Sequence, residues 1–304
     1  MSDLKVNIGN LTLKNPVLTA SGTFGYGEEF SSFFDINDLG GIITKTITLK
    51  PRVGNPFPRI AETPSGMLNS IGLANVGVDA FISEKMPFLK TLNTAVIVNV
   101  AGNTVEEYVE LISKLEDSDA EFDGYEINVS CPNVKEGGVL FGSNYNITAE
   151  ITRKIRKATQ RCVIIKLTPN VTSIGDVAAA VEQAGADSVS LINTLIGMAI
   201  DVDTRRPKIA CITGGLSGPA IKPVALAKVF EVSKRVNIPI IGIGGIMNYQ
   251  DALEFMMAGA TAIEVGTANF IDPAISSTIV ANLHNYCISH NIRHVREIVS
   301  SIIA

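Results

Sequence analysis

The sequence predicts an α/β fold: a (β/α)8 TIM barrel with an N-terminal hairpin and long loop insertions over the C-terminal face of the strands. Short apolar runs rich in β-branched residues recur along the 304 residues, as parallel strands buried on both faces require. Amphipathic segments separate these runs, and polar residues of catalytic type follow several of them, as in a closed barrel. The eight runs are residues 16–20, 41–46, 95–100, 124–129, 162–167, 188–193, 238–243 and 262–265.

The chain before the first run predicts a hairpin over residues 4–14. No apolar stretch resembles a signal peptide or could span a bilayer, and no change of composition marks a linker. The four cysteines lack CxxC spacing, which favours a reducing compartment and argues against an internal iron–sulfur cluster. Residues 1–304 are therefore expected to form one cytoplasmic domain without a membrane segment.

Helix starts are predicted from capping residues. Asn103 followed by Glu106 predicts a cap for a helix over residues 105–115, and Asn248 predicts a similar start before the eighth run. The Asp-Pro pair at residues 272–273 predicts a cap followed by proline at the first helical position.

Two connections are longer than a barrel needs, residues 47–94 and residues 194–218. Long loops in compact domains usually carry function. Both connections are expected to lie over the mouth of the barrel.

Cys131 is the strongest candidate for a reacting group. It follows the fourth run, and Pro132 prevents the strand from continuing. A lone cysteine is more often a small buried apolar residue. The polar side chains of Asn128, Ser130 and Asn133 favour a chemical role instead, since each would need a hydrogen-bond partner in a packed core.

Glycine-rich loops follow the seventh and eighth runs, at residues 242–248 and 264–268. Barrel enzymes commonly bind a phosphate at these two positions, where exposed N–H groups and a helix N-terminus favour an anion. Tight turns alone would also explain any single glycine. A Rossmann site is less favoured because the expected acidic residue is missing.

Lys45 and Lys166 lie at or near the ends of apolar runs. A buried lysine requires a negative partner. One interpretation is an internal salt bridge, for instance of Lys166 with Glu126 or Glu264. The other is that both lysines face a cofactor that acquires negative charge, as reduced flavin does.

Composition bears on the partners. With 46% hydrophobic and 18% charged residues, and a mean hydropathy of +0.28, the chain is expected to oligomerise. A net charge of −5 without a basic cluster argues against nucleic acid. Three histidines and Cys287 fall between residues 284 and 294, but a helix break near Asn291 argues against a metal site.

Several motifs together resemble the class 1B catalytic subunit of the dihydroorotate dehydrogenases, over essentially the whole chain. These motifs are ASG at residues 20–22, ITKT at 43–46, NSIGL at 69–73, NVSCPN at 128–133, GGLSG at 214–218 and the two glycine loops. The resemblance implies a barrel that holds FMN and oxidises dihydroorotate to orotate in pyrimidine biosynthesis. Cys131 would be the base that takes the C5 proton, and FMN would take the hydride from C6.

The resemblance also implies a role for each matching position. The residues that would contact FMN are Ser21, Lys45, Thr46, Asn99, Asn128, Lys166, Ile192, Gly218, Gly244, Gly245, Gly266 and Thr267. Those that would hold the pyrimidine and its carboxylate are Lys45, Asn69, Ser70, Ile71, Gly72, Leu73, Asn128, Asn133, Asn193 and Thr194.

In class 1B, electrons pass to a second subunit that carries FAD and a [2Fe–2S] cluster, and then to NAD⁺. The resemblance thus implies a homodimeric core with two such subunits, a heterotetramer. Class 1A enzymes, which are homodimers that reduce fumarate, are an alternative. Two others are a flavin-free phosphosugar isomerase or aldolase, with Lys166 forming a Schiff base, and a non-catalytic scaffold for a redox partner.

Overall fold

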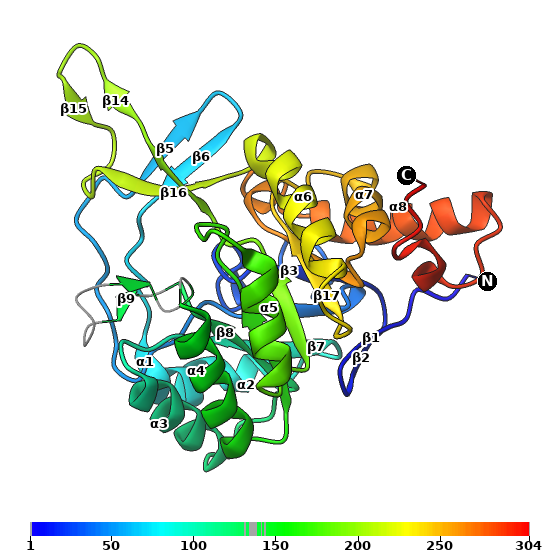
Figure 1. The fold of residues 1–304 in the computed structure, drawn as a ribbon, viewed down its shortest axis with the longest axis horizontal. Helices are drawn as coiled ribbons and strands as arrows, with labels where there is room; N and C mark the ends of the chain where they lie inside the picture. Colours follow the sequence, from blue (N-terminus) through cyan, green and yellow to red (C-terminus); the bar gives the residue numbers. More distant parts are fainter. Residues whose placement is uncertain (1, 131, 134–138, 141, 143, 304) are drawn as a thin grey trace.

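The computed structural model describes residues 2–303, except residues 131, 134–138, 141 and 143. Eight parallel strands close into a barrel at its centre, which confirms the predicted fold class (Figure 1). In hydrogen-bonded order they are β3 (Val17–Thr19), β4 (Gly41–Ile43), β7 (Ala95–Val100), β8 (Gly124–Asn128), β11 (Cys162–Lys166), β12 (Ser188–Leu191), β17 (Ile240–Ile243) and β18 (Ala262–Val265), which pairs with β3.

The apolar runs form strands because both faces of each strand are covered. All five residues of β11 are buried, and so are all five of β8, with which β11 pairs in parallel from Cys162 opposite Gly124 to Lys166 opposite Asn128. Every predicted run contains one barrel strand. The runs extend past the strands at several carboxyl ends, for instance to Thr46 after β4, since apolar character does not stop where the ladder stops.

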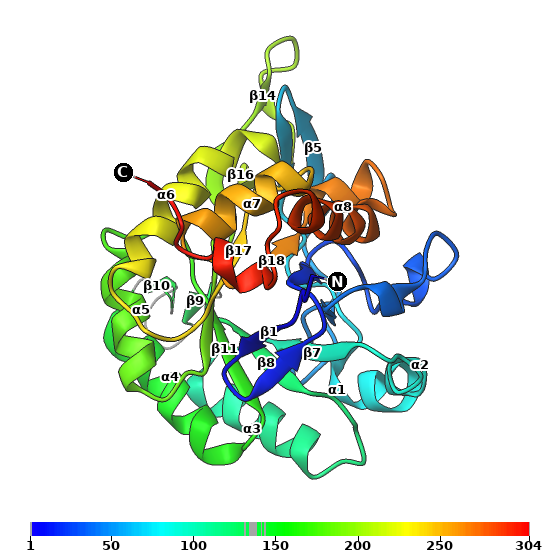
Figure 2. The same cartoon turned by 90° about the vertical axis from the view of Figure 1, so that its right-hand side faces the viewer.

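Helices surround the barrel (Figures 1 and 2). They are α1 (Gly77–Ala80), which continues through a π-helical turn (Phe81–Lys85) into α2 (Met86–Leu89), then α3 (Val105–Glu116), α4 (Tyr145–Ala158), α5 (Ile174–Gln183), α6 (Lys222–Ser233), α7 (Tyr249–Ala258) and α8 (Ile275–Ser289). Short 3-10 helices span Glu28–Phe30, Ile36–Asp38, Pro219–Ile221, Thr267–Phe270 and Val295–Ile298. None of the helices within the described ranges has the length and apolar character needed to cross a bilayer.

The cap predicted for α3 is wrong by one residue. Thr104, not Asn103, is the N-cap, and its Oγ1 accepts a hydrogen bond from the Glu107 N–H. The Glu107 carboxylate in turn accepts from the Asn103 backbone N–H and side-chain amide. Two adjacent polar residues offered two registers for the same capping pattern, and the sequence alone does not distinguish them.

The cap predicted for α8 is also wrong, whereas the one for α7 is confirmed. The α8 helix begins at Ile275, because Asp272 accepts a hydrogen bond from the Ala274 N–H and so closes a turn before the helix. The Asn248 side chain caps α7 by accepting from the Asp251 N–H at 3.0 Å.

The two long connections pair with each other. The first contributes β5 (Ile60–Thr63) and β6 (Gly66–Asn69), and the second contributes β13 (Leu195–Met198) and β16 (Thr213–Ser217). They form one antiparallel sheet in the order β13-β16-β6-β5, which we call the added sheet. A hairpin of β14 (Ile200–Asp201) and β15 (Arg206–Pro207) extends from it (Figure 1). After β8 comes a further pair, β9 (Pro132–Asn133) and β10 (Val139–Leu140).

The predicted N-terminal hairpin is confirmed as β1 (Val6–Ile8) and β2 (Leu11–Leu13). It lies across the other end of the barrel, as Figure 2 shows. The Cys162 thiol, at the start of β11, contacts the Ile8 carbonyl oxygen at 3.4 Å. The hairpin therefore covers the amino ends of the strands and leaves the carboxyl ends to the added sheet.

Candidate functional site

A cavity of about 860 Å³ lies between the carboxyl ends of the barrel strands and the added sheet. Cofactor and ligand sites commonly measure about 300–1,000 Å³. Most of the residues expected to bind ligand line this cavity. They are Ser21, Lys45, Thr46, Asn69, Ile71, Leu73, Asn128, Lys166, Ile192, Asn193, Thr194, Gly218, Gly244, Gly245, Gly266 and Thr267.

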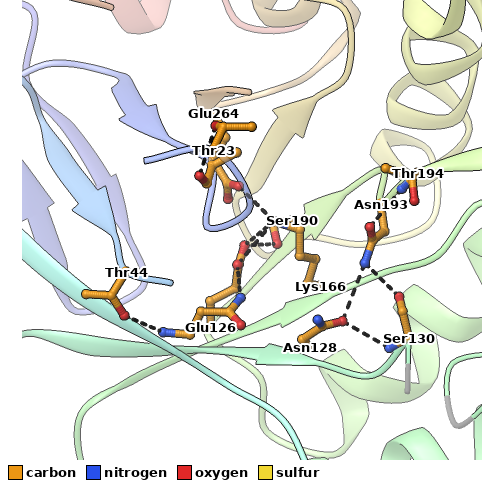
Figure 3. Close-up of polar contacts among 12 residues, drawn as sticks. Thr23, Thr44, Glu126, Asn128, Ser130, Lys166, Ser190, Asn193, Thr194 and Glu264 are labelled. Carbon is orange, nitrogen blue, oxygen red and sulfur yellow. Dashed lines mark hydrogen bonds and ion pairs between the residues drawn. The ribbon is translucent and has the colours of Figure 1, made fainter. Parts of the chain in front are cut away.

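Lys166 lies at the inner end of the cavity, between two carboxyl groups (Figure 3). Its Nζ is 3.2 Å from Glu126 Oε2 and 3.0 Å from Glu264 Oε2. Both glutamates are fully buried, and Lys166 is 5% exposed. We call Glu126, Lys166 and Glu264 the charged triad. The internal salt bridge is thus confirmed, with both of the candidate partners.

The two neighbouring carboxyl groups favour the charged form of Lys166. Burial alone would lower the pKa of Lys166, but the two neighbouring carboxyl groups raise it to about 12. Lys166 lines the cavity and the two glutamates do not. A bound molecule would therefore meet the ammonium rather than the carboxylates.

Lys45 is the second cation of the cavity. It follows β4, its side chain is half-buried, and burial lowers its pKa. No carboxylate in the described part of the chain forms a salt bridge with it. A partly desolvated ammonium without a negative partner favours an anionic ligand.

A cluster of Asn128, Ser130 and Asn193, which we call the amide cluster, lies at the ends of β8 and β12 (Figure 3). Asn193 Nδ2 donates to Ser130 Oγ at 2.8 Å and to Asn128 Oδ1 at 3.4 Å, and the Ser130 N–H also donates to Asn128 Oδ1. The Tyr108 hydroxyl of α3 donates to the Asn128 carbonyl oxygen at 2.7 Å and fixes the end of the strand. Of the three polar side chains predicted to crowd together, Asn128 and Ser130 therefore lie together at the end of β8, and the side chain of Asn133 lies outside the described residues.

Two glycines at the cavity leave room for a ligand, Gly22 after β3 and Gly266 in the loop after β18. A Cβ atom added at Gly22 would meet no atom within 4 Å, and one at Gly266 would meet only Ala20 Cβ at 3.6 Å. Gly245 has a φ of +72°, and a Cβ there would lie 2.8 Å from the Gly218 carbonyl oxygen. Gly22 and Gly266 thus border open space, while Gly245 is required by the close approach of two loops.

Some predicted residues lie elsewhere. Asn99 is fully buried beneath the cavity, where its amide donates to Glu126, so it supports the charged triad. Ser70 and Gly72 do not line the cavity, and a Cβ at Gly72 would lie 2.6 Å from the Asn55 backbone nitrogen. Cys131 lies outside the described residues, and so does the side chain of Asn133.

Other lining residues were not predicted. Gly22 and Thr23 follow the predicted Ser21, and Ser217 precedes Gly218 and accepts from the Thr267 hydroxyl at 2.9 Å. Gly22 and Ser217 belong to two of the motifs named above and Thr23 follows one, so the motifs could have indicated these three. Phe270 and Ile271 are exposed apolar residues at the cavity, and no sequence pattern marks them. In the part of the chain that the structure describes, no group of three or more His, Cys, Asp or Glu side chains could hold a metal ion.

The chain is similar to known proteins over almost its whole length. The family model for dihydroorotate dehydrogenase matches residues 3–286. The chain is 58% identical to the dihydroorotate dehydrogenase B (NAD(+)) catalytic subunit of Geotalea daltonii, over 99% of this chain and 98% of the relative. It is 54% identical to the protein of the same name from Bacteroides thetaiotaomicron, over 99% of each chain. A crystal structure of dihydroorotate dehydrogenase from Eimeria tenella in complex with ferulenol has the same fold, with a TM-score of 0.80, 24% identity and coverage of 98% and 88%.

Replacing Lys166 by methionine should lower the free energy of unfolding by about 3–5 kcal/mol at neutral pH, because two buried carboxyl groups lose their cation. The loss should shrink in acid, where both carboxyl groups can be protonated. Urea denaturation at several pH values measures this. The control is Lys228→Met, which removes a more exposed pair with Glu231 and should cost less than about 1 kcal/mol. Equal losses of unfolding free energy in the two variants would contradict the role of Lys166 as the cation that the two buried carboxyl groups require.

Proposed function

The chain belongs to the dihydroorotate dehydrogenase family, and from that premise we propose that it is a class 1B catalytic subunit. It oxidises dihydroorotate to orotate in pyrimidine biosynthesis, holds one FMN, and passes electrons through a partner subunit to NAD⁺. The observation that carries this proposal is a cavity at the barrel mouth with two ammonium groups and a cluster of amides.

The residues of the cavity suit FMN. Gly22 and Gly266 leave open space next to the loop after β18, where barrels commonly bind phosphate. Lys166 presents a fixed positive charge, which favours negative charge on a reduced isoalloxazine ring. FMN supplies the two-electron acceptor that the side chains of this chain lack.

The remaining polar groups suit the substrate. Lys45 supplies an ammonium for the carboxylate of dihydroorotate. The amides of Asn69, Asn128 and Asn193 can each donate and accept, and so match the alternating N–H and C=O groups of a pyrimidine ring. Cys131 is the proposed base, and Ser130, the residue before it, belongs to the amide cluster.

Two alternatives are less well supported. A Schiff base requires a neutral amine, whereas Lys166 is held as an ammonium ion between two carboxyl groups, which disfavours the flavin-free aldolase reading. A fumarate-reducing class 1A enzyme would have a similar cavity. The relatives from Geotalea daltonii and Bacteroides thetaiotaomicron carry NAD(+) in their names, which favours NAD⁺ over fumarate as the final electron acceptor.

The proposed assembly is a homodimer with two partner subunits that carry FAD and [2Fe–2S]. Its support is a group of exposed apolar side chains on the added sheet and its hairpin, Ile196, Met198 and Ile200, of the kind that protein contacts cover. The cytoplasm is the proposed compartment, since Cys162, Cys211 and Cys287 are unpaired thiols.

The purified chain should be yellow, and anaerobic dihydroorotate should bleach its flavin absorbance. Co-expression with a subunit that carries FAD and [2Fe–2S] should add reduction of NAD⁺ by dihydroorotate, which the chain alone should not catalyse. A colourless protein, or bound flavin that dihydroorotate does not bleach, would contradict the proposal. Fumarate reduction by the chain alone would replace class 1B by class 1A.

Replacing Cys131 by alanine should leave FMN bound but slow its reduction by dihydroorotate by about 10²- to 10⁴-fold, the usual contribution of a positioned base. An ordinary thiol has a pKa of about 8.5, so forming the thiolate at pH 7 costs roughly 2 kcal/mol. The wild-type rate should therefore rise with pH, and Cys131→Ser should be slow at neutral pH and recover in part in alkali.

Stopped-flow absorbance measures these rates. Cys211→Ala, which changes an exposed thiol, is the control and should reduce its flavin at the wild-type rate. Reduction of the Cys131→Ala flavin at the wild-type rate would remove Cys131 from the chemistry.

A further inference from the structure

The charged triad contains two carboxyl groups but one amino group. Glu126 on β8 and Glu264 on β18 are both fully buried, and both contact the same ammonium group, that of Lys166 on β11. Within the described residues, no other cation forms a salt bridge with either carboxyl group. If both glutamates were ionised, the triad would carry one uncompensated negative charge inside the barrel, which a low-dielectric interior strongly opposes.

The two carboxyl groups also lie close together, because an oxygen of each contacts the same Lys166 Nζ, Glu126 Oε2 at 3.2 Å and Glu264 Oε2 at 3.0 Å. Two ionised carboxylates side by side in a buried site repel each other, and a proton on one of them removes that repulsion. Carboxyl pairs that share one proton arise for this reason. Geometry and charge therefore agree that the triad holds one proton in addition to those on Lys166.

We propose that Glu126 and Glu264 share one proton, carried by Glu264, so that the triad is neutral and presents only the Lys166 ammonium to the cavity. The hydrogen-bond partners decide which glutamate is ionised. Glu126 accepts from Asn99, from Ser190 at 2.7 Å and from Lys166. Glu264 accepts from Lys166 through Oε2, while its buried Oε1 has no partner. The better-bonded group is the carboxylate.

The pKa shifts of the two glutamates are opposite and support the same assignment. Burial, and then the negative charge of Glu126, raise the pKa of Glu264 well above its ordinary value. Burial alone would also raise the pKa of Glu126, but Lys166 and several hydrogen bonds lower it. The charged groups that face Glu264 within the described residues are Glu126 from β8 and Lys166 from β11.

The stability that Glu264 contributes depends on pH. Because its pKa is higher in the folded than in the unfolded chain, this contribution is complete below the ordinary carboxyl pKa and is lost as the pH rises through the folded value. The stability difference between the wild type and Glu264→Gln should therefore move against the wild type with rising pH.

The shared proton bears on the cavity, and this step rests on the proposed function. A neutral triad leaves the Lys166 ammonium free to favour negative charge on a bound flavin. A triad with both glutamates ionised would place one net negative charge below the same site. Glu264 is thus a positioning residue that acts through Lys166.

Isotope-difference infrared spectroscopy of the whole protein tests this proposal. Glutamate labelled with ¹³C at the side-chain carboxyl separates protein carboxyl bands from those of a bound flavin. At neutral pH the wild type should show the C=O band of a protonated glutamic acid, shifted in D₂O. Glu264→Gln should lose that band, and so should Glu126→Gln, since a single carboxylate beside Lys166 needs no proton.

Glu116→Gln is the matched control. It removes a carboxylate that pairs with Arg161 at 3.1 Å outside the triad, and it should retain the band. A wild-type spectrum without the band, or a band that persists in either triad variant, would overturn the proposal. The wild-type spectrum decides even if a variant does not fold. Because the measurement needs no dihydroorotate, its failure is distinguishable from failure of the proposed function.

Discussion

The site depends on the contact of one lysine with two buried carboxyl groups. Lys166 projects from an apolar strand into a barrel that would exclude a bare charge, and Glu126 and Glu264 make its burial tolerable. Asn99 and Ser190 then satisfy Glu126, so polar side chains from several strands meet at one level of the barrel. The ammonium remains at the cavity, where a cofactor that gains negative charge can use it.

The closed barrel explains how residues far apart in the chain reach this cavity. Parallel strands all end at the same rim, so segments from Ser21 to Thr267 contribute side chains to one cavity. The two long connections complete it by pairing β6 with β16, with Gly215 opposite Asn69. The hairpin at the other end covers the amino ends of the strands and leaves the mouth as the place for ligands.

Much of this arrangement could be predicted from the sequence. Each barrel strand is a local apolar run, and buried parallel strands require such runs whatever surrounds them. The caps of α3 and α8 were wrong because neighbouring polar residues could satisfy the same N–H groups in more than one register. Ser70 and Gly72 are expected to bind substrate because they belong to a motif, but they do not line the cavity, and a glycine at position 72 also allows the close approach of Asn55, which depends on packing that a motif does not show. Phe270 reaches the cavity through tertiary packing, which leaves no local pattern.

The most direct test of the central claim is a crystal structure of the chain with FMN and orotate. We expect the flavin to lie in the cavity with its pyrimidine edge against the Lys166 ammonium, and orotate to lie between the flavin and the Cys131 thiol, with its carboxylate at Lys45. A flavin bound elsewhere, or a Lys166 that contacts only Glu126 and Glu264 and no part of the cofactor, would contradict the account.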